Sequence, residues 1–565
     1  MRRMVRSTTV LMLLAVGAPA CAATSFTLEN VTLESGGTIY RAGKLDVTDS
    51  ELSREEMQAL LAGGKGDPVS QQFAKVNAAR IAAPELVADQ TAGEVTEIVT
   101  YLDVVFDKVV SGRIGQATAS GATFTIKGPQ TGDMSGRTGA ISLSAIDLPA
   151  LSHMLVEGRA SAEEAAHTMI ASGTVADLDV DLPSGGHGHI ARIDLREAGG
   201  RALAVPMNSL VDLAPKADAS PPSPERKRAL SGVLADLLTS QSLAALDLKD
   251  VTIQSAPASA TTVKVASLAF AGIAGGKIGR TALDGLAVAS DGSDGATTVA
   301  HLSFDGIDLT PLLAASISED PPARVPLKFD RIALEGFASK VAGAGQPLSL
   351  SVGHVVIDAK DWRDLLPQGL GFSVTNFAFD LPTDDVRARP LLDLGYTRLD
   401  LSMSADAAYD AAKSELTLKR LSVSEPAVGS ADLAASFSNV GAEFLGSDPE
   451  KARAALAAAL FRHASLAVND SGLLGRMIES QAKQSKSTPA DVRMHWASGV
   501  RAAAMALLSD NADRGAVADA AEQFVRNGGR LALTADAPNG VGLIDLMLAG
   551  GVQGVLGKLK LAPQR

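Results

Sequence analysis

An internal repeat constrains the fold of this chain more than any other feature of its sequence. Residues 101–124 (YLDVVFDKVVSGRIGQATASGATF) and 265–288 (VASLAFAGIAGGKIGRTALDGLAV) both alternate apolar residues, reach a Gly-basic-Ile-Gly tetrapeptide and resume the alternation. Downstream, GAISLSAIDLPALSHML from Gly139 matches VAHLSFDGIDLTPLLAA from Val299. Each copy predicts strand, turn, strand, polar hairpin, strand, and then an Ile-Asp-Leu that opens a Leu-rich helix.

The glycines of the second copy, AGIAGGKIGR at residues 271–280, resemble a phosphate-binding P-loop at first sight. A P-loop needs Gly five positions before its Gly-Lys pair, where Ala271 stands, and Ser or Thr after the Lys, where Ile278 stands. The alternation that follows predicts a strand rather than the helix whose N-terminus would bind phosphate. We therefore expect these glycines to form a tight turn or bulge between neighbouring strands.

The aspartates of the Ile-Asp-Leu segments have a structural explanation. Asp147 and Asp308 each follow a predicted strand and precede a helical pattern, with Pro149 and Pro311 in the first turn. Such a carboxylate is placed to cap the helix N-terminus. A looser third copy, LSLSVGHVVIDAKDWRDLLP, offers Asp361 as its capping residue.

These patterns predict an α+β protein of elongated, antiparallel β-rich repeat units with helices packed on the sheets and a helical C-terminal region. The expected divisions are a signal peptide (1–22), a first β/α unit (23–213), a Pro/Ser-rich linker (214–228), a second, related β/α unit (229–385), a β-meander (386–446) and a helix-rich region (447–565). Capping boxes SREE and SAEE predict helices at Ser53 to Ala62 and Ser161 to Ala171.

The predicted β-meander gives the clearest face assignment. Period-2 alternation places one set of residues on a common face: Leu399, Leu401, Met403, Leu416, Leu418, Leu433, Ala435 and Phe437.

The N-terminus is typical of an exported protein. MRRMVR is a basic segment, TTVLMLLAVGA is apolar, and APACAA supplies small residues for cleavage, expected after Ala22 with Ala20 or Ala23 as alternatives. Cleavage removes Cys21, the only cysteine, and we expect a periplasmic protein with no transmembrane helix after it. The alternative is a lipoprotein acylated at Cys21.

Composition argues against some partners and leaves chemistry unassigned. A net charge of −13 disfavours nucleic acid and anionic membrane surfaces, and 4% aromatic residues leave few stacking platforms. The sequence contains no Gly-x-Ser-x-Gly and no His-Glu-x-x-His motif. We assign no catalytic, cofactor-binding or metal-binding residue, expect no cofactor, and do not expect an enzyme.

One segment carries a competing metal-site hypothesis. In DLDVDLPSGGHGHIARIDL, Asp177, Asp179 and Asp181 alternate along a predicted strand, and His187 and His189 follow a turn. A hairpin would bring the histidines near the aspartates, as a metal site requires. The simpler interpretation is the solvent face of a hairpin whose Leu178, Val180 and Leu182 face inward.

Residues 399–440, LDLSMSADAAYDAAKSELTLKRLSVSEPAVGSADLAASFSNV, resemble the repeating strands of AsmA-like envelope proteins and of related uncharacterised periplasmic proteins of alphaproteobacteria. The GRIG and IDLPAL segments and GGRLALTADAP near the C-terminus resemble the second group. The AsmA-like resemblance implies an elongated, apolar-lined β groove and a role in outer-membrane assembly and phospholipid transport. The cleavable N-terminus and the helices after Ser447 depart from that pattern.

Three functions remain open at this stage. The resemblance favours a non-catalytic periplasmic envelope protein that binds an apolar ligand such as lipid or supports outer-membrane assembly, with lipid or envelope proteins as partners. The alternatives are a periplasmic metal-dependent hydrolase with a site near Asp177 to His189, and a purely structural or interaction protein. The oligomeric state stays open.

Overall fold

The chain is described from a computed structural model. It covers residues 23–35, 37–63, 67–128, 132–159, 161, 163–183, 185–206, 224–256, 261–290, 295–318, 325, 327–341, 348–363, 366–445, 449–544 and 555–564. The predicted signal peptide at 1–22, Cys21 included, lies outside these residues, as does the part of the predicted linker before Pro224.

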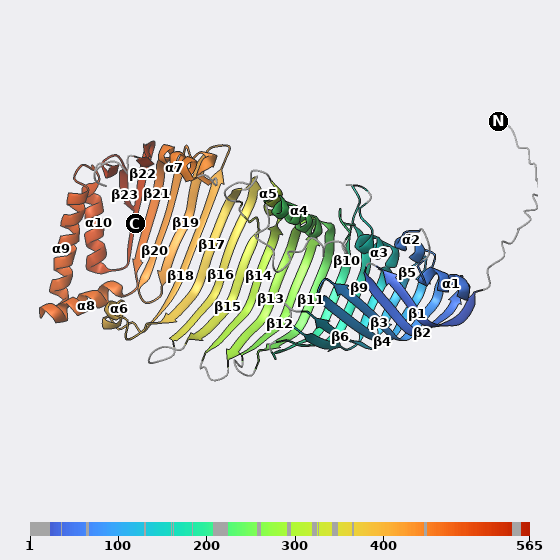
Figure 1. The fold of residues 1–565 in the computed structure, drawn as a ribbon. Coiled ribbons are helices and arrows are strands. Elements are labelled where there is room, and N and C mark those ends of the chain that lie inside the picture. The colour runs from blue at the N-terminus through green and yellow to red at the C-terminus, as the bar shows by residue number, and fades with distance from the viewer. Residues whose placement is uncertain are drawn as a thin grey trace, which may run out of the picture.

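Across the described residues, one antiparallel sheet of 23 strands runs the length of the molecule (Figure 1). Each strand pairs with the next along the chain, except that β5 and β6 together occupy one position in the sheet, and β7 and β8 the next. The N-terminal strands are β1 (Thr24–Ser35), β2 (Thr38–Ser50), β3 (Ala78–Ala92), β4 (Val95–Val110), β5 (Arg113–Ala119), β6 (Gly121–Lys127), β7 (Met134–Thr138), β8 (Ile141–Asp147), β9 (His167–Asp181) and β10 (His187–Gly200).

The remaining strands continue the same order without a break in hydrogen bonding. They are β11 (Gln241–Gln254), β12 (Thr261–Ala274), β13 (Lys277–Ser290), β14 (Ala296–Asp308), β15 (Arg331–Val341), β16 (Leu348–Arg363), β17 (Leu366–Asp380), β18 (Arg398–Asp410), β19 (Glu415–Glu425), β20 (Gly429–Ser438), β21 (Leu460–Asp470), β22 (Arg530–Gly542) and β23 (Lys560–Gln564).

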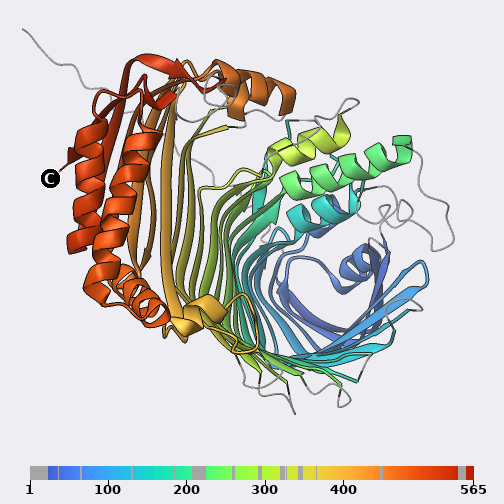
Figure 2. The same cartoon turned by 90° about the vertical axis from the view of Figure 1, so that its left-hand side faces the viewer.

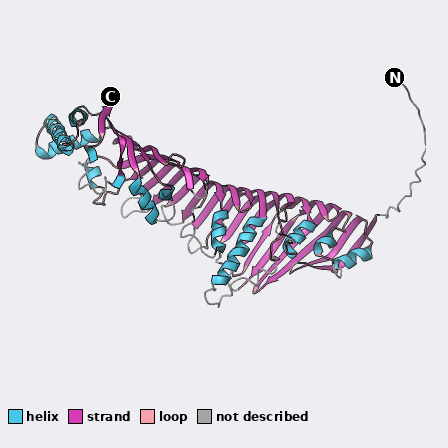
Figure 3. Cartoon of the chain, turned by 90° about the horizontal axis from the view of Figure 1, so that it is seen from above, coloured by secondary structure: helices cyan, strands magenta, loops and turns pink. Residues whose placement is uncertain are grey.

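The helices connect strands and lie along one side of the sheet when it is seen from above (Figure 3). They are α1 (Arg54–Leu61), α2 (Val69–Phe73), α3 (Leu148–Val156), α4 (Pro224–Ser240), α5 (Thr310–Ile317), α6 (Arg389–Asp393), the 3-10 helix η2 (Ala442–Leu445), α7 (Pro449–Ala458), α8 (Leu473–Ser485), α9 (Pro489–Leu507) and α10 (Arg514–Asn527). Within the described residues, none of them is both long and apolar enough to cross a membrane. The α+β class, the antiparallel sheet, the packed helices and the helical C-terminal region are confirmed.

The sheet is strongly curved, and its N-terminal end curls around α1 (Figure 2). Positive φ angles recur inside its strands, for example at Asp177 (48°), Asp250 (52°), Gly285 (65°), Gly336 (62°) and Asn376 (54°). These five residues lie in one row across the sheet. In each strand the residues just before and just after the left-handed residue pair with the neighbouring strand, and these pairs follow one another from strand to strand. A left-handed residue bends a strand locally, so we call this row a crease.

A second crease runs parallel to the first, nearer the edge that carries the loop helices. Its left-handed residues are Lys108, Ala145, Glu197, Gly272 and Gly306. At both creases the inward-facing positions move by one residue. Leu283 and Leu286 therefore face the same side although Asp284 and Gly285 separate them.

The repeat is confirmed as a structural equivalence. Both copies form a two-residue turn with two positive φ angles, Ser111-Gly112 (51° and 72°) and Gly275-Gly276 (58° and 79°). This is the geometry of a type I′ hairpin, which favours glycine. After each turn the basic residue and Ile pair with Asp and Ile of the third strand: Arg113 with Asp147, Ile114 with Ile146, Lys277 with Asp308, and Ile278 with Ile307.

The capping predictions divide between the copies. Asp147 is the N-cap of α3, and its carboxylate accepts the Ala150 amide at 3.0 Å. In the second copy the N-cap position of α5 is Leu309, and the Asp308 carboxylate, one residue earlier, accepts the Thr310 amide at 3.0 Å. The Asp361 prediction is wrong, because Asp361 lies inside β16 with φ 54° and does not precede a helix within the described residues. The equivalent residue is Asp358, which pairs with Arg331 as Asp147 pairs with Arg113.

The two capping boxes also differ in outcome. Ser53 and Glu56 form the predicted box at the start of α1. The helix predicted at Ser161 to Ala171 is wrong, because β9 already begins at His167. Glu164, which would have completed the box, instead accepts the Ala202 amide at 3.1 Å. Pairing of β9 with β8 and β10 outweighs the local helical pattern.

The sheet continues through each predicted unit boundary. β10 pairs with β11, β17 with β18, and β20 with β21, so the two repeat units, the β-meander and the strands of the C-terminal region are successive stretches of one ladder.

The crease makes a specific prediction about glycine. A Cβ atom at Gly285 would lie 2.8 Å from Cβ of Ala266, and the φ angle of 65° is unfavourable for alanine. Gly285→Ala is therefore expected to destabilise the protein by about 1–3 kcal/mol, measured as a lower thermal unfolding midpoint. The control is Gly499→Ala in α9, where nothing lies within 4 Å of the added Cβ. An equal effect of both substitutions would contradict the crease model.

Candidate ligand-binding face

One face of the sheet is apolar along nearly its whole length. Cross-strand pairing joins one apolar residue from β5 and from each of β8 to β22 into a single row: Ala119, Ile141, Val175, Ile193, Leu248, Leu268, Leu283, Leu302, Leu334, Val355, Val374, Met403, Val423, Ala431, Val468 and Leu531. We call the side of the sheet that carries this row the apolar face. Directly paired residues share a face, so the row is a physical stripe rather than a sequence pattern.

The apolar face is covered at its N-terminal end. Met57 of α1 packs among Leu28, Val47, Val109 and Ile114 in the main core cluster, and all are buried. Since α1 lies inside the curl of the sheet in Figure 2, the apolar face is the concave one there. This cluster closes that end of the face with protein side chains.

Towards the C-terminus the same face is open in part, although Val374 and Leu399 are buried there. Six of its large side chains are 37–50% exposed: Leu370, Phe372, Met403, Leu421, Val423 and Leu466. They share the face because they pair directly or through one neighbour, as Met403 does with Val423 and Leu421 with Leu433, which pairs with Leu466. A contiguous exposed patch of this kind is typical of a binding surface.

A pocket of about 380 Å³ lies where the open part of the apolar face meets the C-terminal helices. The strands contribute Leu401, Val423, Ala431 and Val468, and α8 and α10 contribute Leu473, Leu474, Met477 and Phe524. Its volume falls within the roughly 300–1,000 Å³ of small-molecule sites. Two acidic residues, Glu425 and Asp470, lie among the lining residues. The buried Glu425 carboxylate accepts the Ala427 amide at 2.8 Å.

The opposite face is polar, and its histidines stand beside acids. The pairs that face one another across strands are Asp179 with His189, Asp181 with His187, Asp284 with His301, Glu335 with His354, and Asp536 with His463. The imidazole Nδ1 of His301 lies 2.6 Å from the Asp284 carboxylate, and that of His463 lies 2.7 Å from the Asp536 carboxylate. We call this side the polar face.

The residues of the metal-site hypothesis form the predicted hairpin, which brings all of them except Asp177 together. His187 lies 3.1 Å from the Asp181 carboxylate and 3.6 Å from that of Asp179. His189 Nδ1 lies 2.8 Å from one oxygen of Asp179, and Arg137 Nε lies 3.1 Å from the other. Both carboxylate oxygens therefore already have a side-chain partner, one of them the arginine guanidinium. Hydrogen bonds from His189 and Arg137 hold the pKa of Asp179 below its ordinary value. Asp177 stands in the crease beside Gly139, apart from the histidines. Within the part of the chain that the structure describes, no group of three or more metal-ligand side chains is placed to hold a metal ion.

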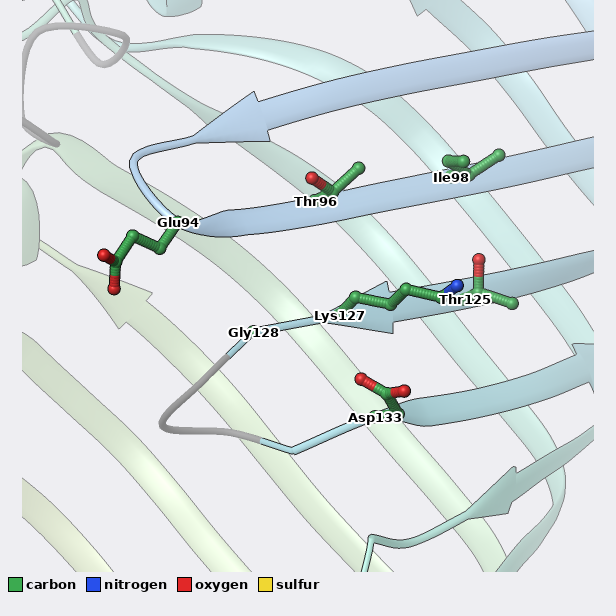
Figure 4. Close-up of a pocket in the computed structure, with 7 residues that line it drawn as sticks. All are labelled: Glu94, Thr96, Ile98, Thr125, Lys127, Gly128 and Asp133. Atoms are coloured by element: carbon green, nitrogen blue, oxygen red, sulfur yellow. The ribbon is translucent and has the colours of Figure 1, made fainter.

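A hollow of about 590 Å³ opens between the ends of β4 and β6 on the polar face (Figure 4). It is lined by Glu94, Thr96, Ile98, Thr125, Lys127, Gly128 and Asp133. In Figure 4 the Glu94 carboxylate points away from the other side chains, and the Lys127 ammonium lies beside Thr125. The hollow therefore brings together no set of converging polar groups.

Sequence reasoning found part of the apolar face and missed the rest. The predicted meander face is confirmed, since Leu416 pairs with Phe437 and Leu418 with Ala435. The missed pattern is a four-residue unit, apolar-x-Asp/Asn/Gly-apolar, at the first crease: VADL, LKDV, LDGL, LEGF and VTNF. Because inward positions shift by one within this unit, a strict period of two breaks there and conceals the continuity of the face.

Comparison with known proteins adds one partial match. Residues 422–562 match the model of a family described only as "Uncharacterized protein". This stretch includes β20, β21, α8 and α10, which contribute most of the residues that line the 380 Å³ pocket. No curated protein matches the chain.

The polar face predicts a pH-dependent contribution to stability. Hydrogen bonds from His301 and then Ser267 hold the pKa of Asp284 below its ordinary value. A carboxylate with a lowered folded-state pKa stabilises the protein above its unfolded pKa of about 3.9, and the benefit disappears as pH falls through the folded value. Asp284→Asn is therefore expected to lower the free energy of unfolding at pH 7 and to cost progressively less below about pH 4.

Urea unfolding between pH 7 and pH 3 measures this difference. The control repeats the comparison in a His301→Gln background, where Asp284→Asn should cost less at pH 7 because one partner is already gone. A loss that is the same at every pH would refute the role assigned to this pair.

Proposed function

We propose that this protein is a non-catalytic, periplasmic envelope protein that holds the acyl chains of lipids against the open part of its apolar face. The observation that carries the proposal is the unbroken row of aliphatic side chains, together with the exposure of Leu370, Met403, Leu421 and their neighbours. An aliphatic surface of this length is unfavourable in water, and covering it releases about 25 cal/mol per Å².

The shape of the surface supports an acyl chain rather than a compact ligand. Neighbouring strands lie about 4.8 Å apart, so a chain that crosses them meets a new apolar side chain at each strand. The row from Phe372 through Ala405, Leu421 and Leu433 to Leu466 supplies these contacts, and Phe372, Leu421 and Leu466 are 37–46% exposed. An acyl chain forms no hydrogen bonds, so it needs no polar partner on this face.

The 380 Å³ pocket beside α8 supports a defined binding position for one end of the acyl chain. Leu401 and Val423 from strands and Met477 and Phe524 from helices enclose space that the open face lacks. Methionine adapts to irregular apolar shapes, which suits a flexible chain end.

The proposed location rests on the leader-like N-terminus and on the AsmA-like resemblance. A polar face rich in ion pairs, such as Arg420 with Asp432 at 2.9 Å, is compatible with an aqueous compartment. In that setting the apolar face would shelter lipid from water or support outer-membrane assembly.

Lipid carried through purification tests the proposal. Protein with native leader processing, purified without detergent, should yield phospholipid or fatty acid on organic extraction and mass spectrometry. Leu421→Asp with Val423→Asp places charges on the open apolar face and should reduce bound lipid about tenfold or more, because burying a carboxylate against an acyl chain is unfavourable.

The matched control is Thr417→Asp with Ser465→Asp, which adds the same charge to the polar face at positions that pair with Ser436 and Ala434 rather than with another acid. Its lipid content should equal that of the wild type. Wild-type protein without lipid, or equal losses in both double variants, would overturn the proposal.

A further inference from the structure

The two ends of the sheet differ in how they are finished. At the C-terminal end α10 packs against β22 and β23, and the Leu561 amide of β23 donates to the Asp513 carboxylate at 3.0 Å. At the N-terminal end, among the residues that the structure describes, β1 pairs with β2 alone. One long strand edge therefore carries backbone groups with no sheet partner in the described chain.

The sequence of β1 does little to protect this edge. Edge strands are commonly kept from pairing by Lys, Pro or a short length. TSFTLENVTLES has twelve residues and contains neither Lys, Arg nor Pro. Glu29 and Glu34 are its only charged residues.

The pattern of β1 is symmetric about its own centre. Leu28 and Val31 flank the left-handed Asn30 on the apolar face, since they pair with Leu45 and Ala42 of β2. Phe26 and Leu33 repeat the arrangement one step outward. Beyond Glu29 on one side and Asn30 on the other, the strand reads apolar, Thr, apolar in both directions.

This symmetry selects one antiparallel register between two copies of β1. With the two-fold axis between Glu29 and Asn30, Leu28 faces Val31 of the second copy, Phe26 faces Leu33, and Thr27 faces Thr32. Glu29 then faces Asn30 and Glu34 faces Ser25, so no two carboxylates are opposed. A shift by one residue would set Leu28 opposite Thr32 and break the match of faces.

We propose that the occupant of this edge is a second copy of the chain, paired antiparallel through β1 in that register. The two-fold axis of this pairing is perpendicular to the sheet, so the apolar faces of the two copies lie on the same side, with the α1-covered end of each at the junction. This inference goes beyond the lipid proposal, because pairing is measured without any ligand.

Two charge variants test the register. Thr27→Lys with Thr32→Lys opposes like charges twice in each pair of copies, whereas Thr27→Lys with Thr32→Glu opposes unlike charges at the same positions. Both variants carry a lysine next to Asp46, whose carboxylate accepts the Thr27 hydroxyl at 2.6 Å. Residue 32 pairs with Arg41 within the chain, so thermal unfolding of each variant is measured first, to show that both are folded under the conditions of sedimentation. Sedimentation equilibrium should give dimers for the wild type and the Lys/Glu variant, and a dissociation constant at least about tenfold weaker for the Lys/Lys variant.

Disulfide trapping provides a second readout. In a Cys21→Ser background the chain has no other cysteine. Thr27→Cys with Thr32→Cys should form a covalent dimer under mild oxidation, whereas Ser25→Cys with Thr27→Cys should not, because these positions are never opposed in the proposed register.

A monomeric wild type at micromolar concentration would overturn the proposal. Equal dimerisation of the two charge variants, or trapping of the Ser25/Thr27 pair as fast as the Thr27/Thr32 pair, would also overturn it.

Discussion

Hydrogen bonding between each strand and the next along the chain is the interaction on which the whole molecule depends. No second sheet packs on the first in the described chain; only helices do, and they cover the apolar face in part. Each strand therefore contacts mainly its two neighbours, and stability accumulates from neighbour to neighbour as in repeat proteins. Short turns such as Ser111-Gly112 and Gly275-Gly276 fix the register of these contacts.

The creases allow such a ladder to bend without losing its two-sided character. A residue such as Asp250 or Gly336 turns the strand, and the inward positions move by one. Leu248 and Val251 thus stay on the same face on either side of Asp250. Without this adjustment, a bent strand would bury polar side chains on one side of the bend and expose apolar ones on the other.

The two faces follow from this arrangement and give the protein its chemistry. Ion pairs and His–acid pairs make one face of the sheet hydrophilic. Apolar side chains line the other face, and helices cover them only in part. The lipid proposal and the paired-copy proposal each start from a part of the sheet that has no partner in the described chain. The first covers the open part of the apolar face, and the second continues the strand ladder past the unpaired edge of β1.

The sequence by itself determined the local elements, because their causes lie within a few residues. Alternation gave the meander strands, Ser53 and Glu56 gave the start of α1, and the Gly-basic-Ile-Gly repeat gave two equivalent hairpins. The α+β class followed from these parts. Tertiary structure decided what depends on neighbours distant in sequence. Strand pairing replaced the helix expected at Ser161 to Ala171, and it made Asp358, not Asp361, the partner of Arg331. It also separated Asp177 from His187 and His189, and joined the predicted units into one continuous apolar face. A crease shifts the inward positions of a strand by one residue, so only cross-strand register reveals which apolar residues stand side by side.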